Sequence, residues 1–536
     1  MRVAFFSLAV VLVGCGTPDT DTPDAYVPVT CVYDGTQWVC GDAGVTVDAG
    51  HDAGTVDSGA VDAGDDAGVV DAGTVDAGMP DSGVEDAGHT LVDVTHAREL
   101  RAAWVATVSR LDWPSAANLS RDAGIASLGA LVEQAADAGL NALFFQVRPY
   151  ADALYESHQG EPWSSYLTSN ADAGPGWDPL EELLPLAHAR GIEVHAWLNP
   201  YRGTVKALSQ YSITYNNTPV MNPGVPAVRE HVVAVVGDIL DHYDVDGVHF
   251  DDYFYPYPDS SNTPFPDSAT YNAYTADGGT MTLGDWRRDN VNQLVAEVMA
   301  LIESDHPTVR FGIGPFGIWK SGQPVPGLSA YDAISCDAVS WLSNGSIDYL
   351  APQLYWKLGS AQDYATLVDW WAARLNGRHL FPGHADYHLT DANNWPLSEL
   401  QSQLEYSRTK RSSGVLGDVH FRFANIRGNG KGLNDLLGRN LYAQPAVPPP
   451  LPRANAVVAP AVPFVSLNGS TLSVTNPMPA SVRAFLLYRE VSAGQWELRA
   501  VKGDAQVDFT VTSGTWAVSA VGRGGGESQG VQVVVP

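Results

Sequence analysis

From residue 99 to about residue 442 the sequence alternates between segments that have the pattern of buried strands and segments that have the spacing of amphipathic helices. Helical spacing of apolar residues is clear at 128–139, 226–244 and 289–305. The eight strand-like segments lie at residues 99–108, 140–148, 192–200, 246–254, 309–319, 347–356, 379–389 and 415–424. Eight strand–helix units predict an α/β fold, a (β/α)8 TIM barrel, which we assign to residues 96–442.

Residues 1–15 predict a signal sequence. They carry one arginine, a short apolar run and the ending Leu12-Val13-Gly14-Cys15. An apolar run of about a dozen residues is too short to span a bilayer. The last four residues resemble the lipobox of bacterial lipoproteins, so Cys15 is the predicted site of lipidation; a plain signal peptide with a chance cysteine is the alternative. Glycine rather than aspartate at position 16 favours the outer membrane of the cell envelope.

Residues 16–95 have the composition of a disordered tether. They contain seventeen acidic residues and no lysine or arginine, which is more than half of the net charge of −31, and they repeat Asp-Ala-Gly from residue 41 to 88. Such a segment cannot bury enough apolar surface to fold. Calcium binding is an alternative, but the spacing lacks the pattern of calcium-binding loops. Because the charge is acidic and confined to this segment, nucleic-acid binding is not expected.

Two of the four cysteines suggest a disulfide. Cys31 and Cys40 flank an alternating apolar segment with Asp34-Gly35 at its turn, so they could face each other across a hairpin in an oxidising compartment. Cys336 has no partner in the sequence and is predicted to be a small buried apolar side chain.

Two segments follow the barrel. Residues 443–460 are rich in proline and predict a stiff, extended linker. Residues 461–536 contain short β-type runs separated by glycine and aspartate turns, which predicts a β-sandwich of the fibronectin III or immunoglobulin-like type. This module has no cluster of aromatic residues typical of a carbohydrate binder, so we expect a spacer or docking role.

In a parallel barrel the active site lies at the carboxyl ends of the strands, where Asp251 and Asp252 end the fourth strand. Side chains alternate along a strand, so His249 and Asp251 should face the barrel axis. Aromatic rings beside hydrogen-bonding side chains suit a sugar. The predicted substrate-binding residues are Gln146, Arg148, Trp163, His195, Trp197, Asn199, Tyr201, Arg202, His249, Tyr253, Gln353, Tyr355 and Trp356.

A purely structural role for Asp251 stays open. A buried charge must be paired or functional, because an isolated buried carboxylate costs several kcal/mol. Asp251 could therefore serve only as the ion-pair partner of Arg148 or His249.

Several stretches of the barrel segment resemble the successive motifs of the glycosyl-hydrolase-like 10 family of bacterial envelope proteins, in the same order over residues 99 to 441. They include ELRAAWVATV from residue 99, EPWSSYLT from 161, YDVDGVHFDDYFYP from 243, GIGPFGIW from 312 and IDYLAPQLYW from 347. The resemblance implies a TIM barrel with glycosidase activity. It also implies, as substrate, a polymer of N-acetylated amino sugars, most simply the glycan strands of peptidoglycan.

Two local resemblances select Asp251 and disagree on its role. The stretch DGVHFDDY, residues 246–253, is similar to the chitinase signature in which this aspartate positions the substrate acetamide, but His249 replaces an aspartate and Tyr253 replaces the acidic glutamate. The same stretch resembles an α-amylase pattern in which this aspartate is the nucleophile.

The general acid is therefore open, since glycoside cleavage needs one protonated carboxyl and a second group that is charged. Asp252 is the first candidate, because adjacent carboxylates push their pKa values apart. Glu161, in the loop after the second strand, is the second candidate, with an ion pair to Arg202 as its structural alternative. Asp386, after the seventh strand, is the third.

No metal and no cofactor are predicted, because His195 has no second ligand at metal-binding spacing. The expected partners are a polysaccharide and, through the lipid alone, a membrane, and the protein is expected to be a monomer. The alternative function is a glycan-binding surface lipoprotein without catalysis, which the missing chitinase-type glutamate suggests.

Overall fold

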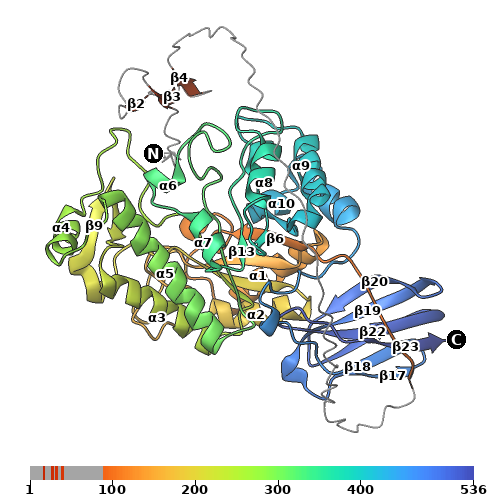
Figure 1. The fold of residues 1–536 in the computed structure, drawn as a ribbon. Helices are drawn as coiled ribbons and strands as arrows, with labels where there is room; N and C mark the ends of the chain where they lie inside the picture. Colours follow the sequence, from red (N-terminus) through yellow and green to blue (C-terminus); the bar gives the residue numbers. More distant parts are fainter. Residues whose placement is uncertain (1–15, 19–25, 29–30, 34–37, 41–88) are drawn as a thin grey trace, which may run out of the picture.

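The computed structural model describes residues 16–18, 26–28, 31–33, 38–40 and 89–536, and its centre is a parallel sheet (Figure 1). The strands of this sheet follow the order β14-β13-β12-β11-β8-β7-β6-β16-β15. Their bounds are β6 (Leu100–Val105), β7 (Ala142–Arg148), β8 (Glu193–Leu198), β11 (Gly247–Phe250), β12 (Arg310–Ile313), β13 (Tyr349–Leu350), β14 (His379–Leu380), β15 (Gly383–Ala385) and β16 (Gly417–Phe421). Every strand-like segment of the sequence therefore contributes to one sheet.

One short segment of the chain joins the two edges of this sheet. β14 pairs with β13, and β15, which begins three residues after β14 ends, pairs with β16. Isolated parallel bridges from Leu380 to Val415 and from Gln353 to Gly383 extend both pairings along the same segment. The segment between residues 379 and 385 thus contacts both neighbours, which is the closure that a (β/α)8 barrel requires.

Helices surround the sheet and return the chain to the next strand (Figure 1). They are α1 (Arg121–Asp137), α2 (Pro179–Ala189), α3 (Pro226–His242), α4 (Ser268–Ala276), α5 (Leu283–Asp305), α6 (Ala330–Ala333), α7 (Ala338–Asn344), α8 (Tyr364–Ala372), α9 (Leu397–Thr409), α10 (Phe423–Arg427) and α11 (Leu433–Leu436). Except for α4, which has no buried residue, their apolar faces join the outward-facing strand side chains in one buried core. Between residues 89 and 536, no helix combines the length and the apolar composition needed to cross a bilayer.

The loops after the second to fifth strands are long. The loop after β8 contains the hairpin of β9 (Ser212–Tyr215) and β10 (Thr218–Met221), and the loop after β11 contains α4. These loops leave the carboxyl ends of the strands, so they stand over the candidate site.

Two antiparallel sheets form the C-terminal module. Their orders are β17-β18-β21 and β20-β19-β22-β23-β5. The strands are β17 (Phe464–Asn468), β18 (Thr471–Thr475), β19 (Val482–Ser492), β20 (Gln495–Lys502), β21 (Gln506–Thr510), β22 (Gly514–Gly522) and β23 (Gly530–Val535). Leu472, Phe485 and Trp516 belong to one buried cluster between the sheets, as in a sandwich, while the fibronectin III or immunoglobulin-like type stays a prediction. β5 (Leu91–Val92), from the end of the predicted tether, pairs with β23.

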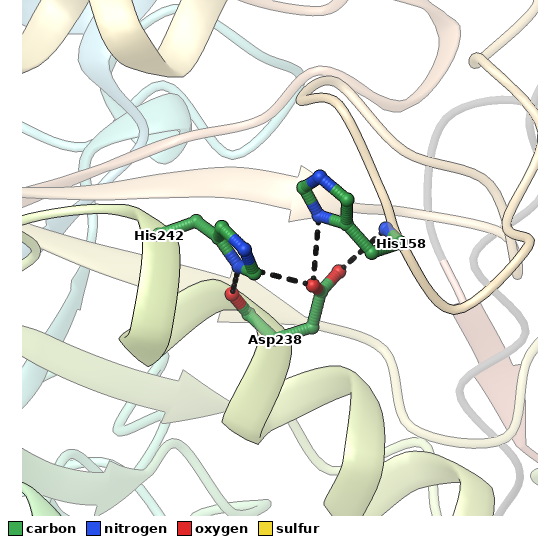
Figure 2. A group of neighbouring side chains, drawn as sticks. All are labelled: His158, Asp238 and His242. Atoms are coloured by element: carbon green, nitrogen blue, oxygen red, sulfur yellow. Dashed lines mark hydrogen bonds and ion pairs between the residues drawn. The ribbon is translucent and has the colours of Figure 1, made fainter.

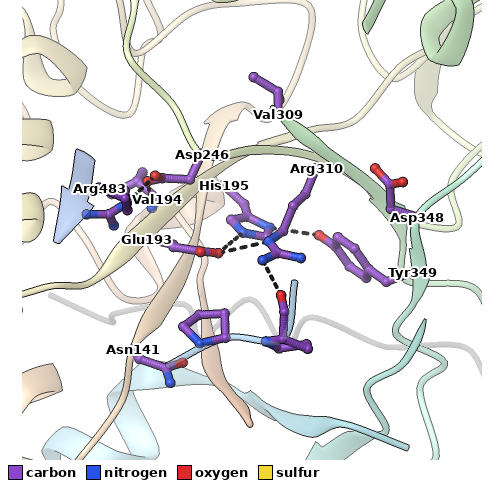
Figure 3. A network of polar contacts seen from close by, with 12 residues as sticks. Asn141, Glu193, Val194, His195, Asp246, Val309, Arg310, Asp348, Tyr349 and Arg483 are labelled. Atoms are coloured by element: carbon purple, nitrogen blue, oxygen red, sulfur yellow. Dashed lines mark hydrogen bonds and ion pairs between the residues drawn. The ribbon is translucent and has the colours of Figure 1, made fainter. Parts of the chain in front are cut away.

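The C-terminal module docks at the end of the barrel where the strands begin. Arg310, the first residue of β12, donates to the carbonyl of Pro449 in the linker. Nε of Arg483 on β19 lies 2.6 Å from Oδ1 of Asp246, which directly precedes β11 (Figure 3). The proline-rich segment therefore packs against the barrel rather than holding the module at a distance. This contact surface is at the end opposite the candidate site.

Among the described residues that precede residue 89 there are four short strands. β1 (Gly16–Pro18) pairs with β2 (Tyr26–Pro28), and β3 (Cys31–Tyr33) pairs with β4 (Trp38–Cys40). The register places Cys31 opposite Cys40, as the predicted hairpin requires, while the disulfide itself stays a prediction. Cys336 is a buried free cysteine, as predicted. Cys15 lies outside the described residues.

Candidate active site

Asp251 and Asp252 follow directly after β11, at the carboxyl end of the barrel. Both are buried, with exposed fractions of 7% and 2%. The backbone N–H of Tyr253 donates to Oδ1 of Asp251 (3.1 Å), and Nδ2 of Asn199, just after β8, donates to Oδ2. The hydroxyl of Tyr257 donates to Oδ2 of Asp252. The strand end thus holds two neighbouring carboxyls, each with its own donors.

Burial and mutual repulsion set the order in which the two carboxyls ionise. Burial, together with the neighbouring charge of Asp252, raises the pKa of Asp251 to about 8. Burial also raises the pKa of Asp252, to about 6, and Tyr257 and Gln353 oppose this only in part. At neutral pH Asp251 therefore holds a proton beside a charged Asp252. The sequence made Asp252 the first candidate for the acid, whereas the two pKa shifts favour a proton on Asp251.

A hydrogen-bond relay fixes the donor that contacts Asp251. Oε1 of Gln146 accepts from the backbone N–H groups of Thr107 (3.0 Å) and Val108 (2.9 Å), so its amide nitrogen faces Asn199. Nε2 of Gln146 donates to Oδ1 of Asn199 (2.7 Å), which turns the amide nitrogen of Asn199 toward Asp251. Gln146 and Asn199, which the sequence predicts as substrate ligands, are positioning residues for Asp251 in this arrangement.

Replacing Asn199 by leucine, which has a similar shape and no donor, is expected to raise the pKa of Asp251 further, since the lost hydrogen bond favours the ionised form. The alkaline limb of the pH–rate profile should move upward, and kcat should fall by up to about tenfold, equivalent to about 1.4 kcal/mol. Steady-state rates across the pH range measure both. A variant with the pH–rate profile of the wild type would show that Asn199 does not influence Asp251. The control is Asn262→Leu, in the loop after β11.

Glu161 forms a buried ion pair with Arg148. Nη2 of Arg148 and Nε2 of His231 on α3 each lie 2.8 Å from Oε1 of Glu161. Burial alone would raise the pKa of Glu161, but Arg148 and His231 outweigh it and lower the pKa to about 2. A carboxyl that stays charged across the physiological range cannot donate a proton, so the geometry favours Asp251 over Glu161 as the proton carrier. The partner of Glu161 is Arg148 rather than Arg202.

Arg148 is fully enclosed by protein and does not reach the rim. Its Nη1 donates to the carbonyls of Asn199 (2.8 Å) and Pro200 (3.1 Å). It therefore ties the end of β7 to the chain leaving β8, a structural role in place of the predicted substrate contact.

His249 and His195 belong to a buried network inside the barrel. Nε1 of Trp104 donates to Nε2 of His249 (3.0 Å), and Nδ1 of His249 lies 3.1 Å from the hydroxyl of Tyr349. That hydroxyl lies 2.9 Å from Nδ1 of His195, whose Nε2 lies 3.2 Å from Glu193 (Figure 3). Burial lowers the pKa of His249 well below its ordinary value, so the ring is neutral. The sequence predicts His249 as a substrate-binding residue, with an ion pair to Asp251 as the alternative, but both of its ring nitrogens bond to other residues.

Aromatic side chains stand at the rim, as the sequence predicts. Tyr253 is 42% exposed, and the guanidinium of Arg202 lies over its ring (5.6 Å) and over that of Tyr150 (5.3 Å). The half-buried members of the predicted set are Trp163, Arg202, Gln353, Tyr355 and Trp356. Trp197 and Tyr201 are buried, and within residues 89–536 neither the indole Nε1 nor the hydroxyl has a hydrogen-bond partner.

Asp386, the third candidate acid, is part of another buried pair. Its Oδ2 lies 3.0 Å from Nδ1 of His420, whose Nε2 lies 3.1 Å from the hydroxyl of Tyr442. Asp386 lines a small hollow of about 100 Å³ together with Ala424 and Asn425 near α10. Its carboxylate is committed to His420, which favours a structural role.

Sequence reasoning missed Tyr257 and Tyr349. Tyr257 follows Asp252 by five residues within an aromatic run, so its proximity was a usable signal. Tyr349 lies on β13, and only the closed barrel brings it between His195 and His249.

The chain has named relatives. A model of the family described as glycosyl hydrolase-like 10 matches residues 99–396. Glycosyl hydrolase YngK of Bacillus subtilis (strain 168) is 37% identical over 380 residues, which covers 66% of this chain and 74% of that protein. Glycosyl hydrolase DigH of Escherichia coli (strain K12) is 35% identical over 355 residues, which covers 58% of this chain and 80% of that protein. The solved PgaB (BpsB) glycoside hydrolase domain from Bordetella bronchiseptica is similar with a TM-score of 0.43 and 12% identity, over 64% of this chain and 99% of that domain.

Proposed function

Because the chain belongs to the glycosyl hydrolase-like 10 family, we propose that it is a cell-envelope glycoside hydrolase that cleaves a polymer of N-acetylated amino sugars, with peptidoglycan glycan strands as the substrate. The relatives named glycosyl hydrolase support the reaction class. The aromatic rings and hydrogen-bonding side chains at the strand ends support a sugar polymer as the substrate.

The observation that carries the proposal is the pair of buried, adjacent carboxyls of Asp251 and Asp252 at the carboxyl end of the barrel, whose pKa shifts favour a proton on Asp251 beside a charged Asp252. The other two candidate carboxyls are held in buried pairs, Glu161 with Arg148 and Asp386 with His420. The candidate set therefore supplies one acid, Asp251, and one charged carboxylate, Asp252. A substrate with an N-acetyl group carries its own nucleophile, the acetamide oxygen, and needs only these two groups.

In this mechanism Asp251 donates its proton to the glycosidic oxygen as the bond to the leaving sugar breaks. Asp252 has two effects: its charge keeps Asp251 protonated, and it stabilises the positive charge that develops on the sugar ring. Tyr253, half-exposed at the rim, offers a flat surface to the sugar.

The pH dependence follows from the two pKa values. As the pH rises through about 8, Asp251 loses the proton that it must donate, so activity falls. As the pH falls through about 6, Asp252 becomes neutral and activity falls again. A bell-shaped profile of kcat/KM between these limits is expected. In Asp252→Asn the acid limb should disappear and the alkaline limb should move to lower pH, since the like charge is gone; a wild-type profile without an alkaline limb would contradict the assignment.

The substrate class is tested by comparing peptide-free peptidoglycan strands before and after chemical N-deacetylation. Release of reducing ends from the acetylated strands alone is expected, because the deacetylated sugar lacks the acetamide oxygen. Equal rates on both would contradict the proposed substrate class while leaving the hydrolase class intact.

The location in the envelope also belongs to this proposal. The lipobox-like ending at Cys15 supports a lipid anchor, and the acidic segment that follows would hold the barrel away from the membrane. In a bacterial host, Cys15→Ser should move the protein from the membrane fraction to the soluble fraction, and retention in the membrane fraction would contradict the anchor.

A further inference from the structure

Two histidines and one aspartate meet on the outer surface of the barrel, away from the carboxyls of the candidate active site. Asp238 and His242 lie one turn apart on α3, and His158 comes from the long loop after β7 (Figure 2). One ligand atom from each of the three residues lies within 4.8 Å of the others. The two imidazole rings are stacked, with centroids 4.0 Å apart. Both rings turn Nδ1 toward Oδ1 of Asp238, at 3.0 Å for His158 and 3.2 Å for His242.

The carboxylate of Asp238 is buried without a permanent cation. Its side chain is 1% exposed, and its ion-pair partners within residues 89–536 are the two histidines, with no lysine or arginine among them. Its second oxygen, Oδ2, accepts from the backbone N–H of His158 (2.9 Å). The backbone N–H and the two imidazoles compensate the buried carboxylate, but none of the three carries a permanent charge, so a positive ion between Oδ1 and the two rings would stabilise it further.

The surroundings suit a cation as well. His242 is the last residue of α3, where the helix dipole presents its negative end. The side chains of His158 and His242 are 51% and 46% exposed, so an ion can reach the site from solvent. The backbone N–H that holds Oδ2 orients the carboxylate and leaves Oδ1 for the ion, as outer-shell donors do in metal sites.

We propose that His158, Asp238 and His242 bind a divalent transition-metal ion, with Zn²⁺ as the best match. Two imidazoles and one carboxylate are a ligand set that Zn²⁺ accepts, and three protein ligands leave a fourth position for water. Nδ1 of His242 also lies 2.8 Å from the backbone carbonyl of Asp238. To ligate through Nδ1, His242 would give up this hydrogen bond, and both rings would carry their proton on Nε2. The sequence pattern does not reveal the site, because His158 is eighty residues from Asp238.

Metal binding at this position would clamp the loop after β7 to α3. Three residues after His158 the same loop carries Glu161, which also contacts α3 through His231 (2.8 Å). The ion would therefore reinforce an existing attachment of the loop that carries Trp163 of the rim, and the clamp is independent of the hydrolase proposal.

The test is a calorimetric titration of ZnCl2 into the full chain, purified without a polyhistidine tag and stripped with a chelator. One ion should bind at this site, and His158→Gln and His242→Gln should each weaken its affinity at least about 100-fold. Co²⁺ in place of Zn²⁺ should give a visible absorption band that both variants lose. Zn²⁺ should also raise the melting temperature of the wild type and not of the variants.

The control is His306→Gln. His306 forms a comparable pair with Asp241 of α3, 3.3 Å apart, without belonging to the cluster. This variant should bind Zn²⁺ as the wild type does. Binding that survives in the His158→Gln, His242→Gln double variant, or no binding by the wild type, would overturn the proposal.

Discussion

Replacing Asp251 by asparagine is expected to lower kcat about a thousandfold, within the range of a lost general acid. The amide keeps the shape of the carboxyl but has no acidic proton to give to the leaving oxygen. Asparagine can still accept from the backbone N–H of Tyr253, which donates to Oδ1 of Asp251 in the native chain, so the strand end should keep its conformation. KM should change much less than kcat, because the side chain acts in the transition state rather than in ground-state binding. Initial rates of reducing-end release measure both constants.

The matched control is Asp259→Asn, the same chemical change eight residues further along the loop. Asp259 accepts from backbone groups of its own turn, Ser261 (3.0 Å) and Thr263 (2.8 Å), and its loss should leave kcat within a factor of about two. If Asp251→Asn kept full turnover, the site assignment would be lost even though the hydrolase class would stand.

Replacing Arg148 by methionine is expected to lower the free energy of unfolding by about 3–5 kcal/mol, the cost of leaving a buried charge without its partner. Glu161 would remain charged inside the protein with only His231 beside it. The carbonyls of Asn199 and Pro200 would also lose a donor. Urea unfolding followed by tryptophan fluorescence measures the change.

The double variant Arg148→Met, Glu161→Leu separates the ion pair from other effects. Removing both charges leaves no unpaired carboxylate, so the double variant should recover part of the lost stability. The sequence predicted Arg148 as a substrate ligand. A stable Arg148→Met protein with a raised KM would restore that role and contradict the structural one.

The strand pattern and the position of Asp251 could be predicted because both depend on local rules. Runs with the pattern of buried strands mark each strand, and parallel strands end on the same side of a barrel, so a carboxyl directly after β11 had to lie at that end. The hairpin register that sets Cys31 opposite Cys40 follows from an equally local turn signal.

The pairings could not be predicted, because they depend on which strands become neighbours in space. His249 bonds to Trp104 and Tyr349, which come from strands far apart in the sequence. From the sequence alone Asp251 was offered as its partner, because that is the nearest carboxyl along the chain. The sequence suggested Arg202 as the ion-pair partner of Glu161, but the fold places Arg148 beside it. Proline content predicted an extended linker, but it could not show that Arg310 would hold the carbonyl of Pro449 against the barrel.

Mass spectrometry of the products formed from peptide-free peptidoglycan strands in heavy-oxygen water tests the central claim most directly. Hydrolysis by the wild type should give shorter glycans that carry one heavy oxygen at each new reducing end, and Asp251→Asn should give almost none. Glycan that is bound without any new ends, or products that end in an anhydro sugar without heavy oxygen, would contradict the claim that this barrel is a glycoside hydrolase acting through Asp251.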